Sequence, residues 1–227
     1  EREEFYRILA DHPRSATLAA HTHRHYHHLL DEDEGFPGDI PHHMVSIGAI
    51  CGSWWSGAPD EFGIPHSTMA DGTPTCYTRL HITGSDWKLS WQGARRPAEF
   101  QMHIDAPQAI TEGSDEPLRV TANIYNALPS AEVKMRIGEG EWIEMSRTVR
   151  KDSVRVAVTE RERELGTVPW RRLDEPYQSE HLWEAVTNAG TLDTGVHTIE
   201  IVARDSWWDY KGYRQVYIRK RPVSIPE

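Results

Sequence analysis

Five histidines lie within eight residues, in the run His21-Thr-His23-Arg-His25-Tyr-His27-His28. The run follows a short apolar segment, residues 16–20, that we expect to be a strand. Imidazole is the commonest neutral metal ligand in proteins, and it binds Zn, Fe or Mn without an unusual pKa. Residues i and i+2 of an extended segment point to the same face, so His21 and His23 can approach one site together. The spacing predicts a metal-related role for these two residues.

The other histidines of this region have less specific surroundings. Nine of the thirteen histidines lie in the first 66 residues, so polar site chemistry is concentrated there. For His25, His27 and His28, which directly follow the metal pair, we expect a solvated loop. His42 and His43 precede an apolar segment. They either reach a substrate pocket or mark the exposed start of a strand.

A long segment, residues 52–75, is rich in Gly, Pro, Ser and Trp and shows no clear periodicity, which is typical of a functional loop. We place His66 and Asp71 of this loop near a substrate. Trp54 and Trp55 either stack on a sugar or a base, or plug the loop into the protein. For the second aromatic group, residues 207–210, we expect a contact between domains or sheets.

The composition excludes some function classes. The chain has 227 residues, and its 38% hydrophobic content with nine Trp can fill a core. A net charge of -10 argues against nonspecific binding to nucleic acid or anionic membranes. No apolar run approaches the ~18 residues needed to span a bilayer, and no signal peptide is recognisable. Cys51 and Cys76 either pair in one disulfide or remain two buried thiols.

The elements that must position these residues change character along the chain. Residues 1–13 resemble the last turns of an amphipathic helix stopped by Pro13, so we expect the chain to open in the middle of a fold. Residues 44–51 are apolar and β-branched enough for a buried strand. Residues 77–82 and 87–91 alternate around a Gly-containing turn, which predicts a β-hairpin.

A domain boundary is expected near residues 93–97, which divides the chain into domains 1–97 and 98–227. Beyond it, short alternating segments are separated by turns, which favours a β-sandwich of immunoglobulin or fibronectin type. These segments are residues 118–125, 132–137, 141–145, 195–204 and 213–219. Residues 149–165 fit either a helix or a charged edge strand.

Several of these motifs resemble the calcineurin-like metallophosphoesterases. Residues 18–23, Leu-Ala-Ala-His-Thr-His, are similar to the last metal motif of that family, Gly-His-x-His, with Ala20 where the family commonly has Gly. Residues 51–57 and 63–74 resemble the bacterial subgroup that carries an additional C-terminal domain, and residues 181–183 and 195–205 resemble that domain. The resemblance spans essentially the whole chain.

The resemblance implies a mostly β chain, in which the end of an α/β metallophosphoesterase sandwich is followed by the β-sandwich domain. It also implies two divalent ions, Mn, Fe or Zn, about 3.5–4 Å apart. His21 would serve one ion and His23 the other, in the hydrolysis of a phosphate mono- or diester. A periplasmic or secreted location is favoured by the same resemblance.

The family needs three further motifs upstream of Gly-His-x-His, namely Asp-x-His, Gly-Asp-x-x-Asp and Gly-Asn-His-Asp/Glu, and none occurs here. Residues 38–42, Gly-Asp-Ile-Pro-His, imitate the second but lie on the wrong side of the histidine motif. We therefore expect the chain to be the C-terminal portion of an enzyme whose N-terminal part is its partner. Two imidazoles cannot hold a dinuclear centre, so the chain alone should be inactive, and no catalytic residue is assigned.

Two other functions compete with this interpretation. A noncatalytic β-sandwich that binds carbohydrate or another ligand would make the histidines incidental. An amidohydrolase-like enzyme also opens its metal site with His-x-His, but on the first strand of a (β/α)8 barrel. The β-rich second half of the chain argues against that barrel.

Overall fold

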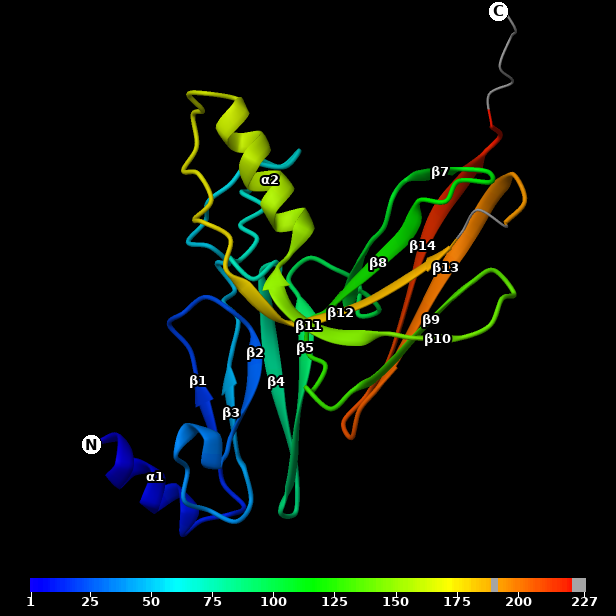
Figure 1. Cartoon of the computed structure of the whole chain (residues 1–227). Helices are drawn as coiled ribbons and strands as arrows, with labels where there is room; N and C mark the ends of the chain where they lie inside the picture. The colour runs from blue at the N-terminus through cyan, green and yellow to red at the C-terminus, as the bar shows by residue number, and fades with distance from the viewer. Residues whose placement is uncertain (189–191, 222–227) are drawn as a thin grey trace, which may run out of the picture.

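The computed structural model describes residues 1–188 and 192–221. It is mostly β, as the sequence predicts, with two α-helices and four separate sheets. Figure 1 shows a small N-terminal sheet, a projecting hairpin beside it, and a two-sheet sandwich that holds the second half of the chain. Neither helix in these two ranges is long and apolar enough to cross a membrane.

The N-terminal part is a three-stranded sheet preceded by the predicted helix, α1 (Arg2–Ala10). Its strands are β1 (Ala16–Ala19), β2 (Tyr26–Leu30) and β3 (His42–Ser46), in the order β1-β3-β2. The central strand β3 runs parallel to β1 and antiparallel to β2. A short 3-10 helix, Glu32–Glu34, follows β2 and is capped by the Asp31 side chain.

In this region one predicted strand has shifted bounds, and one prediction is wrong. The strand expected over residues 44–51 is β3, which begins at His42 and ends at Ser46, because the chain then turns into the loop that holds Gly52. The loop expected to hold His25, His27 and His28 is largely strand β2. Pairing of β2 with β3 turns His27 inward, and both His25 and His27 are buried.

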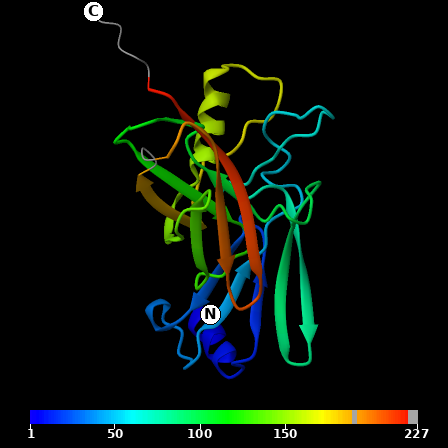
Figure 2. The same ribbon diagram turned by 90° about the vertical axis from the view of Figure 1, so that its right-hand side faces the viewer.

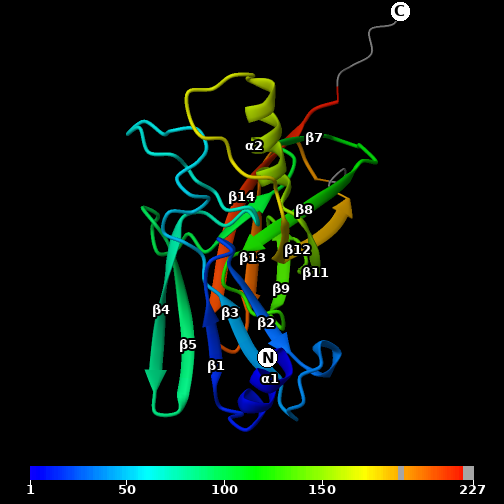
Figure 3. The same ribbon diagram turned by 90° about the vertical axis from the view of Figure 1, so that its left-hand side faces the viewer.

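The predicted hairpin is present as β4 (Cys76–Thr83) and β5 (Asp86–Gly93), paired in register from Cys76 opposite Gly93 to Thr83 opposite Asp86. Figures 2 and 3 show this two-stranded ribbon beside the N-terminal sheet. Its β5 side is anchored, because Leu89 and Trp91 are buried. Cys51 and Cys76 are both free thiols.

The sandwich consists of a five-stranded sheet, β10-β9-β13-β14-β7, and a four-stranded sheet, β11-β12-β8-β6. The segments predicted from alternation are all strands. The nine strands are β6 (Met102–Asp105), β7 (Ala109–Thr111), β8 (Pro117–Ile124), β9 (Glu132–Ile137), β10 (Ile143–Glu144), β11 (Ser146–Lys151), β12 (Gln178–Asn188), β13 (Gly195–Arg204) and β14 (Asp209–Arg219).

The ambiguous segment over residues 149–165 contains both alternatives, because the end of β11 is followed by α2 (Ser153–Glu164). Asp152 separates the two elements and caps the helix, since its side chain accepts a hydrogen bond from the Arg155 N–H. This residue type is among the strongest N-caps. The strand therefore ends at Lys151, and the Asp152 cap begins the helix at Ser153.

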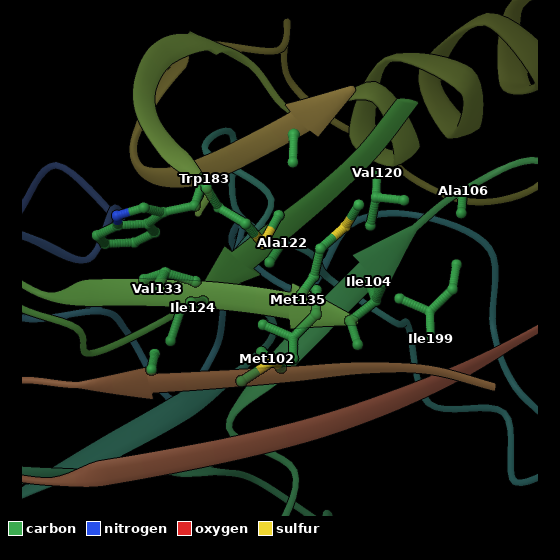
Figure 4. Close-up of a cluster of buried hydrophobic side chains, with 14 of the residues drawn as sticks. Met102, Ile104, Ala106, Val120, Ala122, Ile124, Val133, Met135, Trp183 and Ile199 are labelled. Atoms are coloured by element: carbon green, nitrogen blue, oxygen red, sulfur yellow. The ribbon is translucent and has the colours of Figure 1, made fainter. Parts of the chain in front are cut away.

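The main core lies between the two sandwich sheets (Figure 4), where side chains such as Val120, Met135 and Ile199 are fully buried. A second, smaller cluster joins residues on both sides of residue 97: Met69, Cys76, Trp91 and Tyr125. The N-terminal part and the sandwich therefore share buried apolar contacts. The boundary at residue 97 stays a prediction.

Candidate metal and substrate site

The predicted metal pair lies at one edge of the N-terminal sheet. Strands β1 and β3 are parallel, with Ala19 opposite Ser46, and the Ile47 N–H donates to the Ala19 carbonyl at 2.8 Å. The segments that leave the two strands therefore emerge together. Sites in α/β sheets commonly form at this carboxyl edge. Here the edge brings His21 and His23 beside the loop that begins at Cys51.

The ring of His23 is held on two sides. Its Nδ1 atom contacts the Gly52 carbonyl oxygen, and the ring stacks on Trp54 with centroids 3.8 Å apart and planes 13° apart. A carbonyl oxygen can only accept, so Nδ1 carries the proton and Nε2 keeps its lone pair. Metal-binding histidines are commonly oriented by such a bond from the other ring nitrogen. The Cys51 sulfur lies 3.9 Å from the same Nδ1 atom.

The backbone of this edge is strained. His21 and His23 have φ values of 83° and 48°, and Trp54 and Trp55 have 52° and 55°. Residues with side chains rarely adopt this left-handed conformation, and such strain often marks functional sites. Gly52, with φ 52°, is required by packing, because a Cβ there would lie 1.8 Å from the Ser67 carbonyl oxygen.

A buried polar network supports the histidine segment from behind. The Asp71 carboxylate accepts hydrogen bonds from the backbone N–H groups of His25 at 2.8 Å and Thr73 at 3.0 Å. His181 of β12 lies 3.5 Å from the same carboxylate and its Nδ1 contacts Asn123 at 2.6 Å. Burial alone would raise the pKa of Asp71, but His181 and the two N–H groups lower it below its usual range.

The sequence signals for this network were incomplete. The sequence pattern predicts His181 only as part of a domain motif, and it predicts a solvated loop for His25. In the structure the His25 ring accepts from the Gly48 N–H at 3.2 Å and contacts the Asn126 side chain at 3.2 Å. No local pattern signals this network, because Gly48 and Asn126 lie 23 and 101 residues from His25 along the chain.

Residues 45–210 match the sequence model described as C terminal of Calcineurin-like phosphoesterase. The chain belongs to this family. The match includes the Cys51–Asp71 loop, the hairpin and most of the sandwich, and begins downstream of His21 and His23. No curated protein matches the chain significantly.

For a member of this family the relevant test is whether the donor set fits metal ions. His23 offers a free Nε2, and the His21 ring is exposed, with no hydrogen-bond partner in the described part of the chain. Both fit metal ligands. However, no group of three or more His, Cys, Asp or Glu side chains is gathered for a metal within residues 1–188 and 192–221. The residues present fit two ligands of a centre and not a complete one.

The histidines at the start of β3 lie at the other edge of the sheet. His43 pairs with Ala16, the first residue of β1, whereas the metal pair follows the last residue of that strand. His42 contacts the Thr17 hydroxyl at 2.8 Å, and His43 contacts His27 at 3.0 Å and stacks on Trp207. The structure does not bring these two histidines together with the metal pair. Their contact with a substrate stays a prediction.

The remaining candidates belong to the long loop. The Ser53 N–H donates to the Ser67 carbonyl at 2.8 Å, so the His66 segment lies against the turn that bears the tryptophans. The His66 ring contacts the Thr68 hydroxyl at 3.0 Å, and burial lowers its pKa. Trp55 is 53% exposed. Asp71 is buried, and its polar partners are all protein groups in the described ranges.

Proposed function

We propose that this chain supplies His21 and His23 as two ligands of a dinuclear metal centre that hydrolyses phosphate mono- or diesters. The remaining ligands come from a polypeptide segment carrying the three motifs that this sequence lacks. The observation that carries the proposal is the bond between His23 Nδ1 and the Gly52 carbonyl, because it leaves Nε2 free and fixes the direction of the ring.

The metal ions, Mn, Fe or Zn, would polarise the phosphoryl oxygens and activate water when bound. The residues of this chain orient the ligands and exclude water. Trp54 covers one face of the His23 ring. Asp71 holds the backbone two residues further along through the His25 N–H. One face of the Trp54 ring is covered by His23, whereas Trp55 is 53% exposed, so Trp55 is the aromatic surface that we propose for a substrate.

The first experiment measures metal binding by the purified chain. Calorimetric titration with Zn²⁺ or Co²⁺ is expected to give weak binding that is lost in His21→Ala and in His23→Ala. His12→Ala is the matched control, because His12 is exposed and lies before β1. Equal binding by all four proteins would contradict the assignment of the ligands and favour a noncatalytic binding module.

The two tryptophans separate metal positioning from substrate contact. Trp54→Ala should weaken metal binding about tenfold, since residues that orient a ligand commonly contribute that much. Trp55→Ala should leave metal affinity unchanged. In the enzyme reconstituted with the upstream segment, Trp55→Ala should raise KM more than it lowers kcat.

The second experiment measures hydrolysis of p-nitrophenyl phosphate and its diester. The chain alone should have little or no metal-dependent activity, and co-expression with the segment carrying the missing motifs should restore it. Substantial activity of the 227-residue chain alone would refute the shared site.

A further inference from the structure

A cavity of about 190 Å³ lies away from the histidine edge, between α2, the second half of the long loop and the region around Tyr125. Figures 1 and 3 show that loop beside α2. Pockets for drug-sized ligands usually exceed ~300 Å³, so this cavity suits a smaller molecule. Apolar atoms come from Pro74, Phe100, Val154 and Val158.

Two charged groups on the cavity wall are already satisfied by the protein. The Asp152 carboxylate accepts from the Arg155 N–H at 2.7 Å and from the Asn123 side chain at 3.0 Å. The Arg155 guanidinium donates to the Met69 carbonyl at 3.2 Å, to the Thr159 hydroxyl and to the Asp174 carbonyl. These groups form the frame of the cavity and have few donors left for a ligand.

Three other polar groups of the wall have no such partners. The Tyr125 side chain is only 3% exposed, yet within residues 1–188 and 192–221 its hydroxyl has no hydrogen-bond partner. The hydroxyl oxygen is not sealed inside the protein, and Tyr125 lines the cavity, so the hydroxyl opens into it. A buried hydroxyl without a partner costs free energy that a ligand can recover.

The other two groups are His103 and Arg96. The half-buried His103 ring has no hydrogen-bond partner in the same ranges, and burial lowers its pKa, which keeps it neutral at pH 7. The Arg96 guanidinium has no carboxylate partner there and lies 5.1 Å from the centre of the Phe100 ring. The same Phe100 ring lies 5.8 Å from the Tyr125 ring, so Arg96 and Tyr125 flank one apolar surface.

We propose that this cavity binds a small organic acid consisting of one ring or a short apolar body with a single carboxylate. Arg96 and the Tyr125 hydroxyl donate to the carboxylate, and Phe100 packs against the apolar body. The neutral His103 ring contributes one further donor. Arg155 is held by protein acceptors, so Arg96 is the wall guanidinium with free donors, and together with a phenol it matches one negative charge. The apolar wall disfavours a fully hydrated ion. Neither the metal pair nor Trp54 lines this cavity.

The test uses the full chain, with benzoate as the probe in calorimetry and in saturation-transfer NMR. Benzoate should bind with a Kd near 1 mM or below. Binding should weaken about tenfold in Arg96→Ala and in Tyr125→Phe, since each removes a bond to a charged group. Tyr125→Phe keeps the ring stacked on Trp91, at 4.6 Å in the native protein, so its fold should be retained.

Three controls decide the outcome. Arg14→Ala removes the same charge from an exposed position and should leave benzoate binding unchanged. Val158→Phe fills the cavity and should abolish binding, with folding checked by circular dichroism. Benzamide, which lacks the charge, should bind at least tenfold more weakly than benzoate.

Absence of benzoate binding at about 10 mM would overturn the proposal, as would binding that neither variant changes. If benzamide bound as tightly as benzoate, the proposal that the ligand is an anion would be overturned. Binding of inorganic phosphate in preference to benzoate would overturn the organic acid. Because none of these measurements involves metal or phosphoesterase activity, they are independent of the proposed function.

Discussion

The Asp71 carboxylate accepts a hydrogen bond from the backbone N–H of His25 at 2.8 Å, although 46 residues separate the two along the chain. The bond fixes the β1–β2 connection, which carries the candidate ligands, to the loop after β3. His181 of the sandwich lies against the same carboxylate. The sandwich domain thus contributes to the conformation of the histidine segment without contacting a metal.

Replacing Asp71 with asparagine should destabilise the protein by about 2 kcal/mol. The two N–H groups donate to different oxygens of Asp71, and an amide has only one oxygen and no negative charge to place beside His181. Urea unfolding measures this loss. The His25 amide should also exchange its hydrogen faster in Asp71→Asn. Asp39→Asn, at an exposed position, should stay within about 0.5 kcal/mol of the native protein. Equal stability of the two variants would show that the network contributes nothing.

Alanine at Gly52 should disrupt the candidate site, and alanine at Gly63 provides the control. Both glycines have positive φ, 52° and 75°, so both substitutions should cost about 1 kcal/mol in backbone strain. Only at Gly52 would the new Cβ overlap the Ser67 carbonyl, whereas nothing lies within 4 Å at Gly63. Thermal unfolding should therefore show a clearly larger loss for Gly52→Ala, and a similar loss for both would argue against the packing at Ser67.

Acid should destabilise the protein between pH 6.5 and about 4. Burial, and then the nearby His181, lowers the pKa of His25 to about 4, and burial with His42 does the same for His43. Below pH 6.5 the unfolded chain takes up protons on these histidines and the folded protein does not, so stability falls with falling pH. For His25 alone the slope approaches about 1.4 kcal/mol per pH unit.

Urea unfolding at pH 7.5, 6 and 5 checks this dependence. His43→Gln should reduce the slope, because it removes one group that protonates only when unfolded. His12→Gln, at an exposed position, should leave the slope unchanged. A stability that is flat from pH 7.5 to 5 would contradict burial of the neutral rings.

Trp207 should tie the N-terminal sheet to the sandwich. Its ring stacks on His43 with centroids 5.3 Å apart and meets Trp87 edge-on at 5.1 Å. Trp207→Ala should lower the free energy of unfolding by about 2 kcal/mol, which is less than for a fully buried tryptophan because the ring is only half-buried. Loss of its contacts with His43 and Trp87 should speed proteolysis within residues 1–97. Trp142→Ala, at an exposed turn, should change stability by less than about 0.5 kcal/mol. A larger loss of stability in Trp142→Ala than in Trp207→Ala would show that Trp207 is not the main contact between the N-terminal sheet and the sandwich.

Local pattern was sufficient for much of this fold. The hairpin β4–β5 and the strand β13 follow from alternation and turn residues, which act over a few positions along the chain. The sandwich follows from the repetition of such strands. The sequence predicts a contact between domains or sheets for Trp207 and Trp208, and both rings pack against the β4–β5 hairpin, which belongs to another sheet.

The sequence by itself therefore determined the β-rich class, the family resemblance and the prominence of the histidine run. Only the tertiary structure decided which histidines are inside. His25 and His27 look like solvated polar residues because three further histidines, an arginine and a threonine lie within the same eight residues. His27 is turned inward because β2 pairs with β3. His25 is held by Asp71, which accepts from its backbone N–H, and by Asn126, which contacts its ring, from 46 and 101 residues away. The free energy that buries a polar ring comes from such distant partners, and a local pattern does not contain them.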